Sequence, residues 1–250
     1  MRVTATVAAM IALLLTTAAQ AEQVGGPSGP QKGQLSLGGE AILRTNVDMR
    51  GEVPGVLVYD WSLRSTALYG VLEYGVTDAL SVRGKAGVAE WESLAWPPQF
   101  RQKYDYGFAW AAGLKWRICR PEDHGTALAL SGQYAESEGD ASHFPPILPP
   151  EYHKLETKEW TAALTVGVPH GSARPYAGVV YSDLDLDYRF SVHNMGGGLI
   201  LIALPHTAQK RHHVGAVVGM DHDLGTAGYW NLEARAFDEE GISGSLNFTF

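Results

Sequence analysis

The feature of this sequence that most constrains its fold is an alternation of apolar and polar residues that recurs from Gln34 to the last residue. The stretches are about ten residues long, are bounded by Gly, Pro, Asp or Asn, and show no helical periodicity. The clearest is residues 104–117, YDYGFAWAAGLKWR, whose even positions are apolar and whose odd positions are small or charged. Successive side chains of a β-strand point to opposite faces, so the pattern predicts an all-β fold.

Three features favour a transmembrane barrel over a soluble β-sandwich, in which the same period of two occurs. Charged residues of both signs lie in the middle of the polar faces, and the apolar faces end in Trp, Tyr or Phe. The stretches are also longer than the roughly 5–6 residues of a typical soluble strand. About 11 residues tilted near 45° give an apolar band about 25 Å tall, with lipid outside and a polar interior.

Hydrocarbon cannot hydrogen-bond to an open sheet edge, so the strands must close into a ring. We predict a closed, antiparallel, up-and-down transmembrane β-barrel of about ten strands, with eight strands as the alternative. The expected strands span residues 34–44, 65–75, 79–91, 104–117, 125–135, 156–168, 174–190, 211–221, 228–237 and 241–250. An even number places both chain ends in one compartment, so residues 194–210 are expected to form a loop or hairpin and not an eleventh strand.

The connections between these strands are expected to alternate in length. Short ones would face the periplasm, at residues 76–78, 118–124, 169–173 and 222–227. Long ones would face the cell exterior, at residues 45–64, 92–103, 136–155 and 191–210. The connection at 238–240 is an exception, because it is short and yet falls on the outer side.

Residues 1–21 have the pattern of a cleaved signal peptide. Arg2 precedes an apolar stretch, and Ala-Gln-Ala at 19–21 fits the small-x-small cleavage rule. A membrane anchor is the alternative, but the apolar stretch is shorter than the roughly 20 residues that span a bilayer as a helix. Residues 22–33, EQVGGPSGPQKG, predict a flexible leader, and residues 34–250 form the expected barrel.

Charge and cysteine content exclude other classes. Without Arg2, 18 basic side chains stand against 27 acidic ones, a net charge of −9, and no basic cluster indicates a nucleic-acid partner. The single cysteine, Cys119, cannot form an internal disulfide.

The interior of the barrel is expected to hold a network of charged side chains. Its predicted members are Glu40, Glu73, Arg83, Lys85, Lys115, Glu159, Glu233 and Arg235. We expect Glu73 to pair with Arg83 or Lys85, and Glu233 to pair with the neighbours of Arg235. In a barrel of eight or ten strands, side chains nearly fill the interior, which predicts a plugged or very narrow lumen.

Two patterns are candidate sites of chemistry. Asp183, Asp185 and Asp187 share one strand face and are weak candidates for a metal site, since a calcium loop also needs Gly and Glu where Tyr188 and Asn194 stand. Ser191 and His193 resemble the Ser and His of outer-membrane lipid A deacylases, but in reversed order. We expect no catalytic residue, no cofactor and no enzyme activity, with a lipid-acting hydrolase as the third option.

Parts of the chain resemble a known family. YGVTDALSVR at 74–83, ARPYAGVVY at 173–181, the leader and the final strand GISGSLNFTF are similar to small outer-membrane barrels of Gram-negative bacteria related to OmpA, OmpX and OmpW. The resemblance covers residues 34–250 and implies an outer-membrane location after export. In that family the barrel-assembly machinery reads a last strand that ends in Phe or Trp, which implies an assembly signal at Leu246, Phe248 and Phe250. We expect no peptidoglycan-binding domain after the barrel, and hence no anchor to the cell wall.

The sequence therefore predicts an integral outer-membrane protein with a structural or surface-interaction role. Its expected partners are outer-membrane lipids, the barrel-assembly machinery and an extracellular ligand that the residues do not identify. A narrow channel for small solutes is the alternative.

Overall fold

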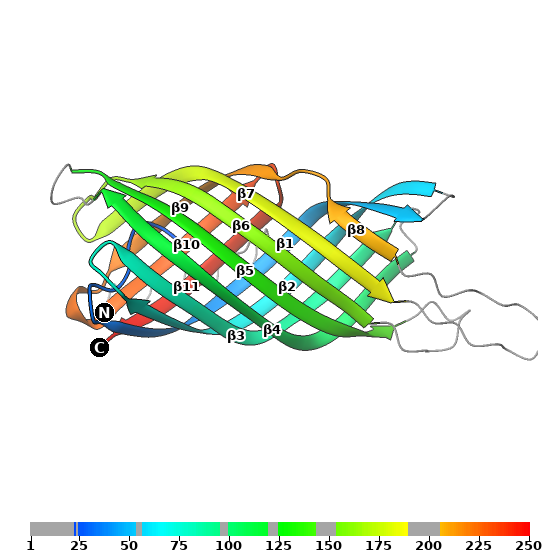
Figure 1. Ribbon diagram of the computed structural model, residues 1–250, viewed down its shortest axis with the longest axis horizontal. Coiled ribbons are helices and arrows are strands. Elements are labelled where there is room, and N and C mark those ends of the chain that lie inside the picture. The colour runs from blue at the N-terminus through cyan, green and yellow to red at the C-terminus, as the bar shows by residue number, and fades with distance from the viewer. Residues whose placement is uncertain are drawn as a thin grey trace, which may run out of the picture.

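The computed structural model describes residues 23, 25–53, 57–95, 100–119, 125–143, 154–189 and 206–250. These residues form one antiparallel sheet that curls into a closed barrel (Figure 1). The strands are β1 (Leu35–Val53), β2 (Leu57–Gly75), β3 (Leu80–Ala95), β4 (Phe100–Cys119), β5 (Ala127–His143), β6 (Lys154–Gly167), β7 (Ala173–Arg189), β8 (His206–Lys210), β9 (Val214–Asp223), β10 (Gly228–Ala236) and β11 (Glu240–Thr249), with a short 3₁₀ helix, η1, at Gly225–Ala227.

The ring closes where the first strand meets the last. β1 pairs with β11 from Ser36 opposite Thr249 to Asn46 opposite Glu240, and Leu35 and Phe250 exchange two further main-chain hydrogen bonds of 2.8 and 3.2 Å. Both termini of the sheet lie at one end of the barrel, here called the terminal end; the opposite end is the loop end (Figure 1). The predicted closed, antiparallel, up-and-down barrel is confirmed.

The described strands form a ring that narrows from one end to the other. At the terminal end, β1–β7 and β9–β11 make a ring of ten strands, the ten-strand section. The β10–β11 hairpin is short, and beyond its tip β8 pairs with both β7 and β1. β1–β7 and β8 thus make a ring of eight strands at the loop end, the eight-strand section. The two strand counts that the sequence leaves open, ten and eight, therefore both occur, at different heights of the barrel.

β8 refines the expectation that residues 194–210 form a loop or hairpin and not an eleventh strand. Residues 206–210 are a strand, while 194–205 lie outside the described residues. β8 and β9 are both antiparallel to β7, so they run in the same direction and act as two offset parts of one crossing. The even number of crossings is therefore kept.

Several strands are longer than the sequence predicts. β1 and β2 remain paired up to Val53 opposite Leu57, so the expected long loop at 45–64 is wrong for all but the three residues 54–56, which lie outside the described residues. The expected loops at 92–103 and 136–155 are likewise shortened, because β3 runs to Ala95, β4 begins at Phe100 and β5 runs to His143.

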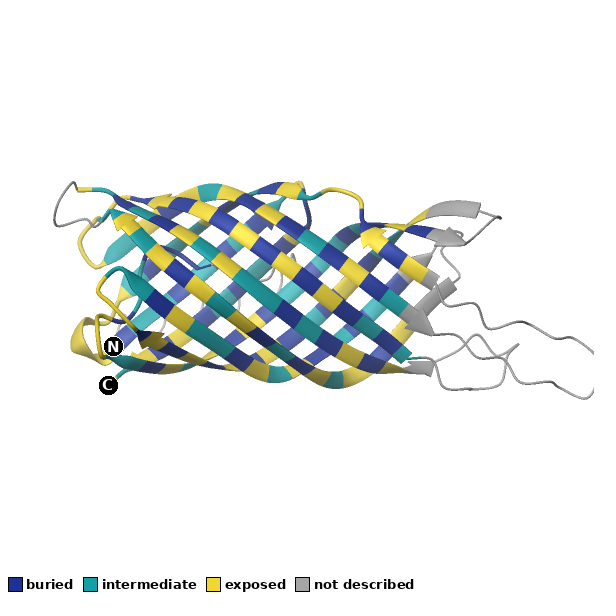
Figure 2. Cartoon of the chain, viewed as in Figure 1, coloured by how far each residue is buried: buried dark blue, intermediate teal, exposed yellow. Residues whose placement is uncertain are grey.

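Outward-facing side chains form an apolar band around the barrel. Buried and exposed residues alternate along each strand (Figure 2). The exposed members include Leu68, Leu72, Val82, Val88, Leu114, Leu164, Val166, Val179, Val218 and Leu246. Aromatic rings border the band, as expected at a membrane–water interface: Tyr74, Trp116 and Phe248 lie toward the terminal end, and Phe108, Trp160 and Tyr181 toward the loop end.

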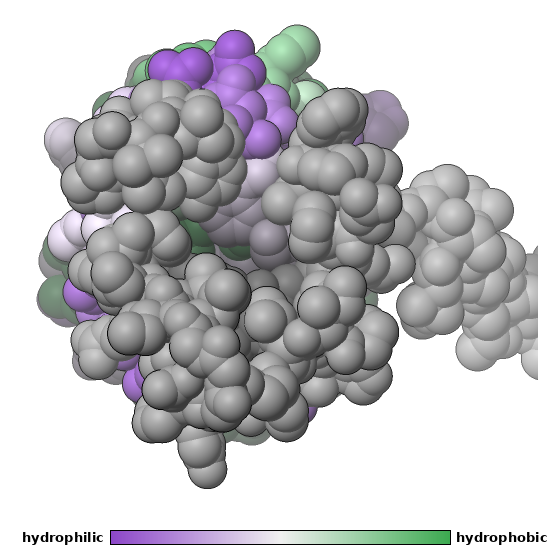
Figure 3. Space-filling model, turned by 90° about the vertical axis from the view of Figure 1, so that its right-hand side faces the viewer, coloured by the Kyte–Doolittle hydropathy of each residue, from purple (hydrophilic) through white to green (hydrophobic). Residues whose placement is uncertain are grey.

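Beyond this band the pattern inverts. On β7, Asp183, Asp185 and Asp187 point outward, whereas Leu184 and Leu186 are buried inside the barrel. In the view onto the loop end, hydrophobic residues are visible inside the ring (Figure 3). A strand that leaves the lipid needs a polar outer face. The expected strands are therefore too short, because the apolar outer face that defines them ends before the strand does.

Two β-bulges accompany the inversion. Between Arg44 and Val47, β1 has one residue more than β2, and between Tyr104 and Gly107, β4 has one residue more than β3. An extra residue shifts the following side chains to the opposite face of the strand. Tyr104 is therefore buried in the interior, which corrects its expected place on the outer face beside Tyr106.

No helix among the described residues is long and apolar enough to cross a membrane.

The apolar band makes a testable prediction about depth. Leu164 faces outward between Trp160 and Val168, so Leu164→Arg should lower the free energy of unfolding by about 2–4 kcal/mol, since a charge near the midplane loses its hydration. Thr207→Arg, on the outward face of β8 in the eight-strand section, is the matched control and should change it by less than about 0.5 kcal/mol. Urea unfolding in lipid vesicles measures both, and equal losses would contradict the assigned band.

Candidate functional site in the barrel lumen

Charged side chains cover much of the inner wall. The eight residues predicted for the lumen all take inward positions; seven are buried, and the side chain of Arg83 is 9% exposed. They are Glu40, Glu73, Arg83, Lys85, Lys115, Glu159, Glu233 and Arg235. These charges are shielded from bulk water, so each needs a partner across the lumen to offset the cost of its lost hydration.

Glu40 on β1 joins two cations of β3. One of its carboxylate oxygens is 2.7 Å from the guanidinium of Arg83, and the other is 2.7 Å from Nζ of Lys85. The ammonium of Lys85 also lies 5.8 Å from the centre of the Tyr69 ring, a cation–π distance. One carboxylate thus pins two positive side chains of the lumen.

The other carboxylates of the mid-lumen accept hydrogen bonds from neutral donors. Ser81 Oγ and the Tyr229 hydroxyl donate to Glu73 at 2.7 and 2.8 Å, and the Tyr176 hydroxyl donates to Glu233 at 2.8 Å. The ion pairs of Arg83 and Lys85 are to Glu40, not to Glu73 as expected. Register explains part of the difference, because Glu40 lies opposite Tyr69 on β2, which in turn lies opposite Gly87 on β3, beside Lys85.

A second group of charges, the hairpin-tip cluster, lies where the ring changes from ten strands to eight. Its members are Arg44, Glu159, Lys210, Arg235, Asp238 and Glu239, three cations and three anions. Lys210 Nζ lies 3.0 Å from Glu239 and 3.2 Å from Asp238, and Arg235 lies 3.1 Å from Glu239. Arg44 pairs with Glu159 and stacks 5.5 Å from the centre of the Trp91 ring.

The turn of the β10–β11 hairpin aims its two acids inward. Phe237 has a positive φ of 81° and is 79% exposed, while Asp238 and Glu239 are almost completely buried. The hairpin ends inside the wall below β8, so its turn faces the lumen and not the exterior. This placement resolves the short connection at 238–240 that seemed to fall on the wrong side.

Sequence reasoning missed four members of this cluster: Arg44, Lys210, Asp238 and Glu239. The pair of acids in a tight turn was visible, but a turn between strands is normally solvated. Only the pairing of β8 across the hairpin tip shows that these acids are covered.

The eight-strand section is filled by apolar side chains. Its fully buried members include Val47, Met49, Leu63, Tyr104, Leu155, Leu184 and Leu186, with Trp91 and Ala208 packed among them. Eight strands leave an interior that side chains just fill. The lumen is therefore occupied by a packed core at this end.

The N-terminal segment, residues 23 and 25–33, occupies the mouth of the ten-strand section. Gln23, Gly25, Gly26, Pro27 and Pro30 are buried. The sequence predicts a flexible leader at residues 22–33; of the described part of that range, residues 23 and 25–30 instead lie inside the ring and bond to its wall, and residues 31–33 are exposed.

Polar groups of the wall hold this segment mainly through its main chain. The amides of Gly25 and Ser28 donate to Glu233 and Asp221 at 2.9 and 3.0 Å. Lys115 donates to the carbonyl of Ser28 at 3.1 Å, and Arg117 donates to the carbonyls of Gly29 and Pro30 at 2.8 and 2.7 Å.

Beside the N-terminal segment a cavity of about 810 Å³ opens at the terminal end. The segment lines it from Pro27 to Gln31, and the wall contributes Arg117, Arg174, Asp221 and Tyr229. The ten-strand section is thus wider than its own side chains and the segment together fill.

The three candidate metal ligands share the outward face of β7, and each contacts a different partner. Asp183 lies 3.4 Å from His213, Asp185 accepts a hydrogen bond of 3.2 Å from Gln209, and Asp187 lies 3.9 Å from Lys158. Among the residues the structure describes, no three His, Cys, Asp or Glu side chains converge as metal ligands.

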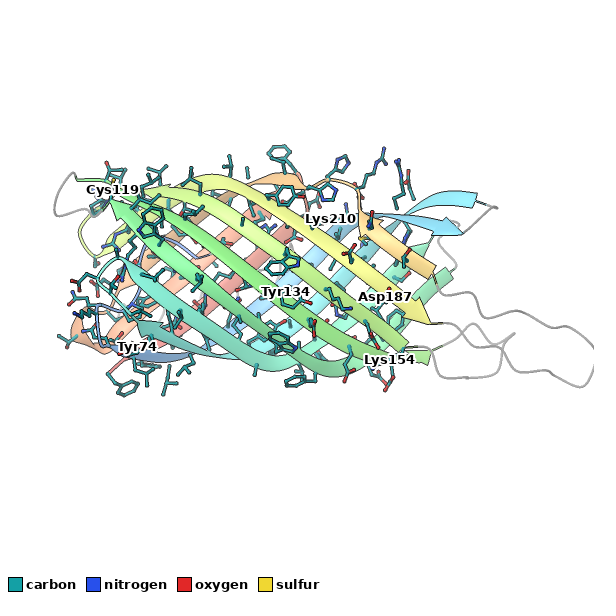
Figure 4. All side chains as sticks on the ribbon, in the orientation of Figure 1. Tyr74, Cys119, Tyr134, Lys154, Asp187 and Lys210 are labelled. Carbon is teal, nitrogen blue, oxygen red and sulfur yellow. The ribbon has the colours of Figure 1, made fainter. Side chains whose placement is uncertain are left out.

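The remaining sequence candidates lie at the surface or beyond the described part. Leu246, Phe248 and Phe250 face outward with 43, 46 and 74% exposure. Ser191 and His193, the candidate hydrolase pair, lie outside the described residues. Cys119 is a half-buried free thiol at the terminal end (Figure 4).

A closed ring with an apolar outer band and a charged inner wall defines a transmembrane β-barrel of the outer-membrane type. No protein-family model and no curated protein matches the sequence.

Solved structures with a similar architecture come from several bacteria. Outer membrane protease OmpT from Escherichia coli shares 11% identity at a TM-score of 0.45, over 89% of this chain and 98% of that one. The translocator domain of autotransporter NalP from Neisseria meningitidis shares 9% at 0.48, over 89% and 90%. The toluene transporter TbuX from Ralstonia pickettii shares 11% at 0.34, over 94% and 95%. At these values the similarity does not extend beyond the barrel architecture.

The buried ion pairs should matter far more than those at the surface. Glu40→Gln leaves Arg83 and Lys85 without their shared anion and should lower the free energy of unfolding by about 3–5 kcal/mol. Asp60→Asn is the control, because Asp60 pairs with Arg50 and Arg211 while half exposed, and should cost less than about 1 kcal/mol. Equilibrium unfolding in detergent compares them, and similar losses would overturn the role given to Glu40.

Proposed function

We propose that this protein is an integral outer-membrane β-barrel with a closed lumen and a structural or surface-interaction role. The terminal end would face the periplasm and the loop end the cell exterior. The apolar band would contact outer-membrane lipids. The finer resemblance to the barrels related to OmpA, OmpX and OmpW belongs to this proposal, as does export by a signal peptide at residues 1–21.

The observation that carries the proposal is the filling of the lumen at three successive heights. The N-terminal segment lies in the mouth, the ion-paired side chains around Glu40 lie in the middle, and the apolar core lies in the eight-strand section. A solute would have to displace all three to pass.

The outer face of the eight-strand section supports a role in surface interaction. Ion pairs lie on this face, among them Lys154 with Glu138 at 2.6 Å and Lys158 with Asp187 at 3.9 Å (Figure 4). A strand wall that projects beyond the apolar band would hold this mixed-charge surface clear of the lipid. An extracellular ligand would meet charges of both signs on the described part of this face.

A narrow channel is the second candidate. Two observations favour it: the cavity at the mouth, and the fact that hydrogen bonds hold the N-terminal segment against the wall. The packed core of the eight-strand section opposes it. The proposal includes no enzymatic step.

The closed lumen predicts an electrically silent barrel. Purified protein inserted into planar bilayers should show no ohmic steps, because the apolar core blocks the path of hydrated ions. The shift in gel migration on heating, measured on the same sample, verifies that the protein inserted is folded. Reproducible single-channel steps from folded protein would favour the channel instead.

We also propose that Leu246, Phe248 and Phe250 guide assembly. Phe250→Ala should lower the fraction of chains that reach the heat-modifiable, folded form in cells several-fold, because it removes an exposed ring from the closing strand. Phe237→Ala, which removes another exposed ring far from that strand end, is the control. Equal assembly of both variants and the parent would sink this role.

A further inference from the structure

The mouth of the ten-strand section is built to hold a peptide. Buried charged groups from different strands converge on the N-terminal segment: Glu233 from β10, Asp221 from β9 and Lys115 from β4, each 5% exposed or less. They bind the main chain of the segment: the acidic groups accept hydrogen bonds from its N–H groups, and the basic group donates to a carbonyl oxygen. A wall of this kind recognises an extended main chain more than particular side chains.

The few side-chain contacts add to this recognition. Arg174 donates to Ser28 Oγ at 2.6 Å, and the Gln23 amide bonds to Asn231. Arg117 alone binds two successive carbonyls, those of Gly29 and Pro30. Such polar contacts are typical of a ligand in a binding site. In a packed core, the segment and the wall would instead contact each other through apolar side chains.

Close approach makes glycine necessary at one position. A Cβ on Gly26 would collide with the carboxylate of Asp221 and the ring of Tyr176, both buried. Gly25 has a positive φ of 73°, which L side chains rarely adopt. Lys32, in contrast, is exposed, and its contact with the described wall is a main-chain hydrogen bond of 3.3 Å to Asp78.

We propose that the mouth of the ten-strand section is a peptide-binding site, and that the N-terminal segment is its intramolecular occupant. When this segment withdraws, the site takes an extended Gly- and Pro-containing peptide from the periplasm. The periplasmic source rests on the orientation in the proposed function. The site is blind, because the apolar core closes the eight-strand section above it, and the cavity beside the segment gives a peptide room to enter.

The test uses the full chain with a protease site inserted between Gly33 and Gln34. Gly33 is exposed and has open space around it, so a folded barrel can be cut there. After cutting, a fluorescent peptide of residues 22–33, EQVGGPSGPQKG, is added and its anisotropy is measured. We expect saturable binding to the cut protein and much weaker binding to the uncut protein, in which the tethered segment competes for the site.

Two altered peptides and one altered barrel test recognition. The Gly26→Ala peptide should bind about tenfold or more weakly, since overpacking a tight site costs this much. The Lys32→Ala peptide should bind like the parent peptide. Arg117→Ala in the barrel should weaken binding of the parent peptide, because it removes the donor to two carbonyls.

Three results would overturn the site: no binding to the cut protein, equal binding of the Gly26→Ala peptide, or a cut segment that a large excess of peptide never displaces. Conductance of the cut protein separates this inference from the proposed function. Peptide binding together with ohmic steps would keep the site and sink the closed lumen. A silent barrel that binds no peptide would do the reverse.

Discussion

The unbroken ring of main-chain hydrogen bonds is the constraint on which the rest of this structure depends. In hydrocarbon an unpaired strand edge has no water to bond, so every edge must find a partner. The β10–β11 hairpin stops short and leaves β1 and β7 without neighbours at the loop end, beyond the apolar band, where an open strand edge would pair with other chains. β8 takes both edges, through Met49–Glu52 on one side and Asp185–Tyr188 on the other. Narrowing from ten strands to eight follows from this repair.

The width of the ring then decides what fills it. Where eight strands close, apolar side chains pack into a core resembling that of a soluble barrel, and the outer face turns polar. Where ten strands close, the same number of inward side chains per strand leaves space, which the N-terminal segment and a cavity occupy. The hairpin-tip cluster lies at the boundary between the two sections. Its three cations and three anions are shielded from water together, because the hairpin turn lies under β8.

Much of the fold was predictable, because lipid imposes a simple rule on the strands. The alternation around Leu164 and Val166 shows that an apolar face must look outward, and all ten crossings were located from it. The rule fails above the lipid, where Leu184 and Leu186 point inward and no pattern on a single strand shows which face is which. Bulges at Arg44 and Tyr104 add a shift of one residue that alternation alone does not reveal.

The sequence by itself determined that the chain is a barrel and that eight charged side chains, of both signs, face its lumen within the apolar band. Those properties are local, since they follow from the position of each residue along its own strand. Only the tertiary structure decided the partners: Glu40 joins Arg83 and Lys85, Asp238 and Glu239 meet Lys210, and residues 25–30 enter the mouth. Such contacts join residues far apart in the chain, and they depend on the register and width of the closed ring, which no single strand encodes.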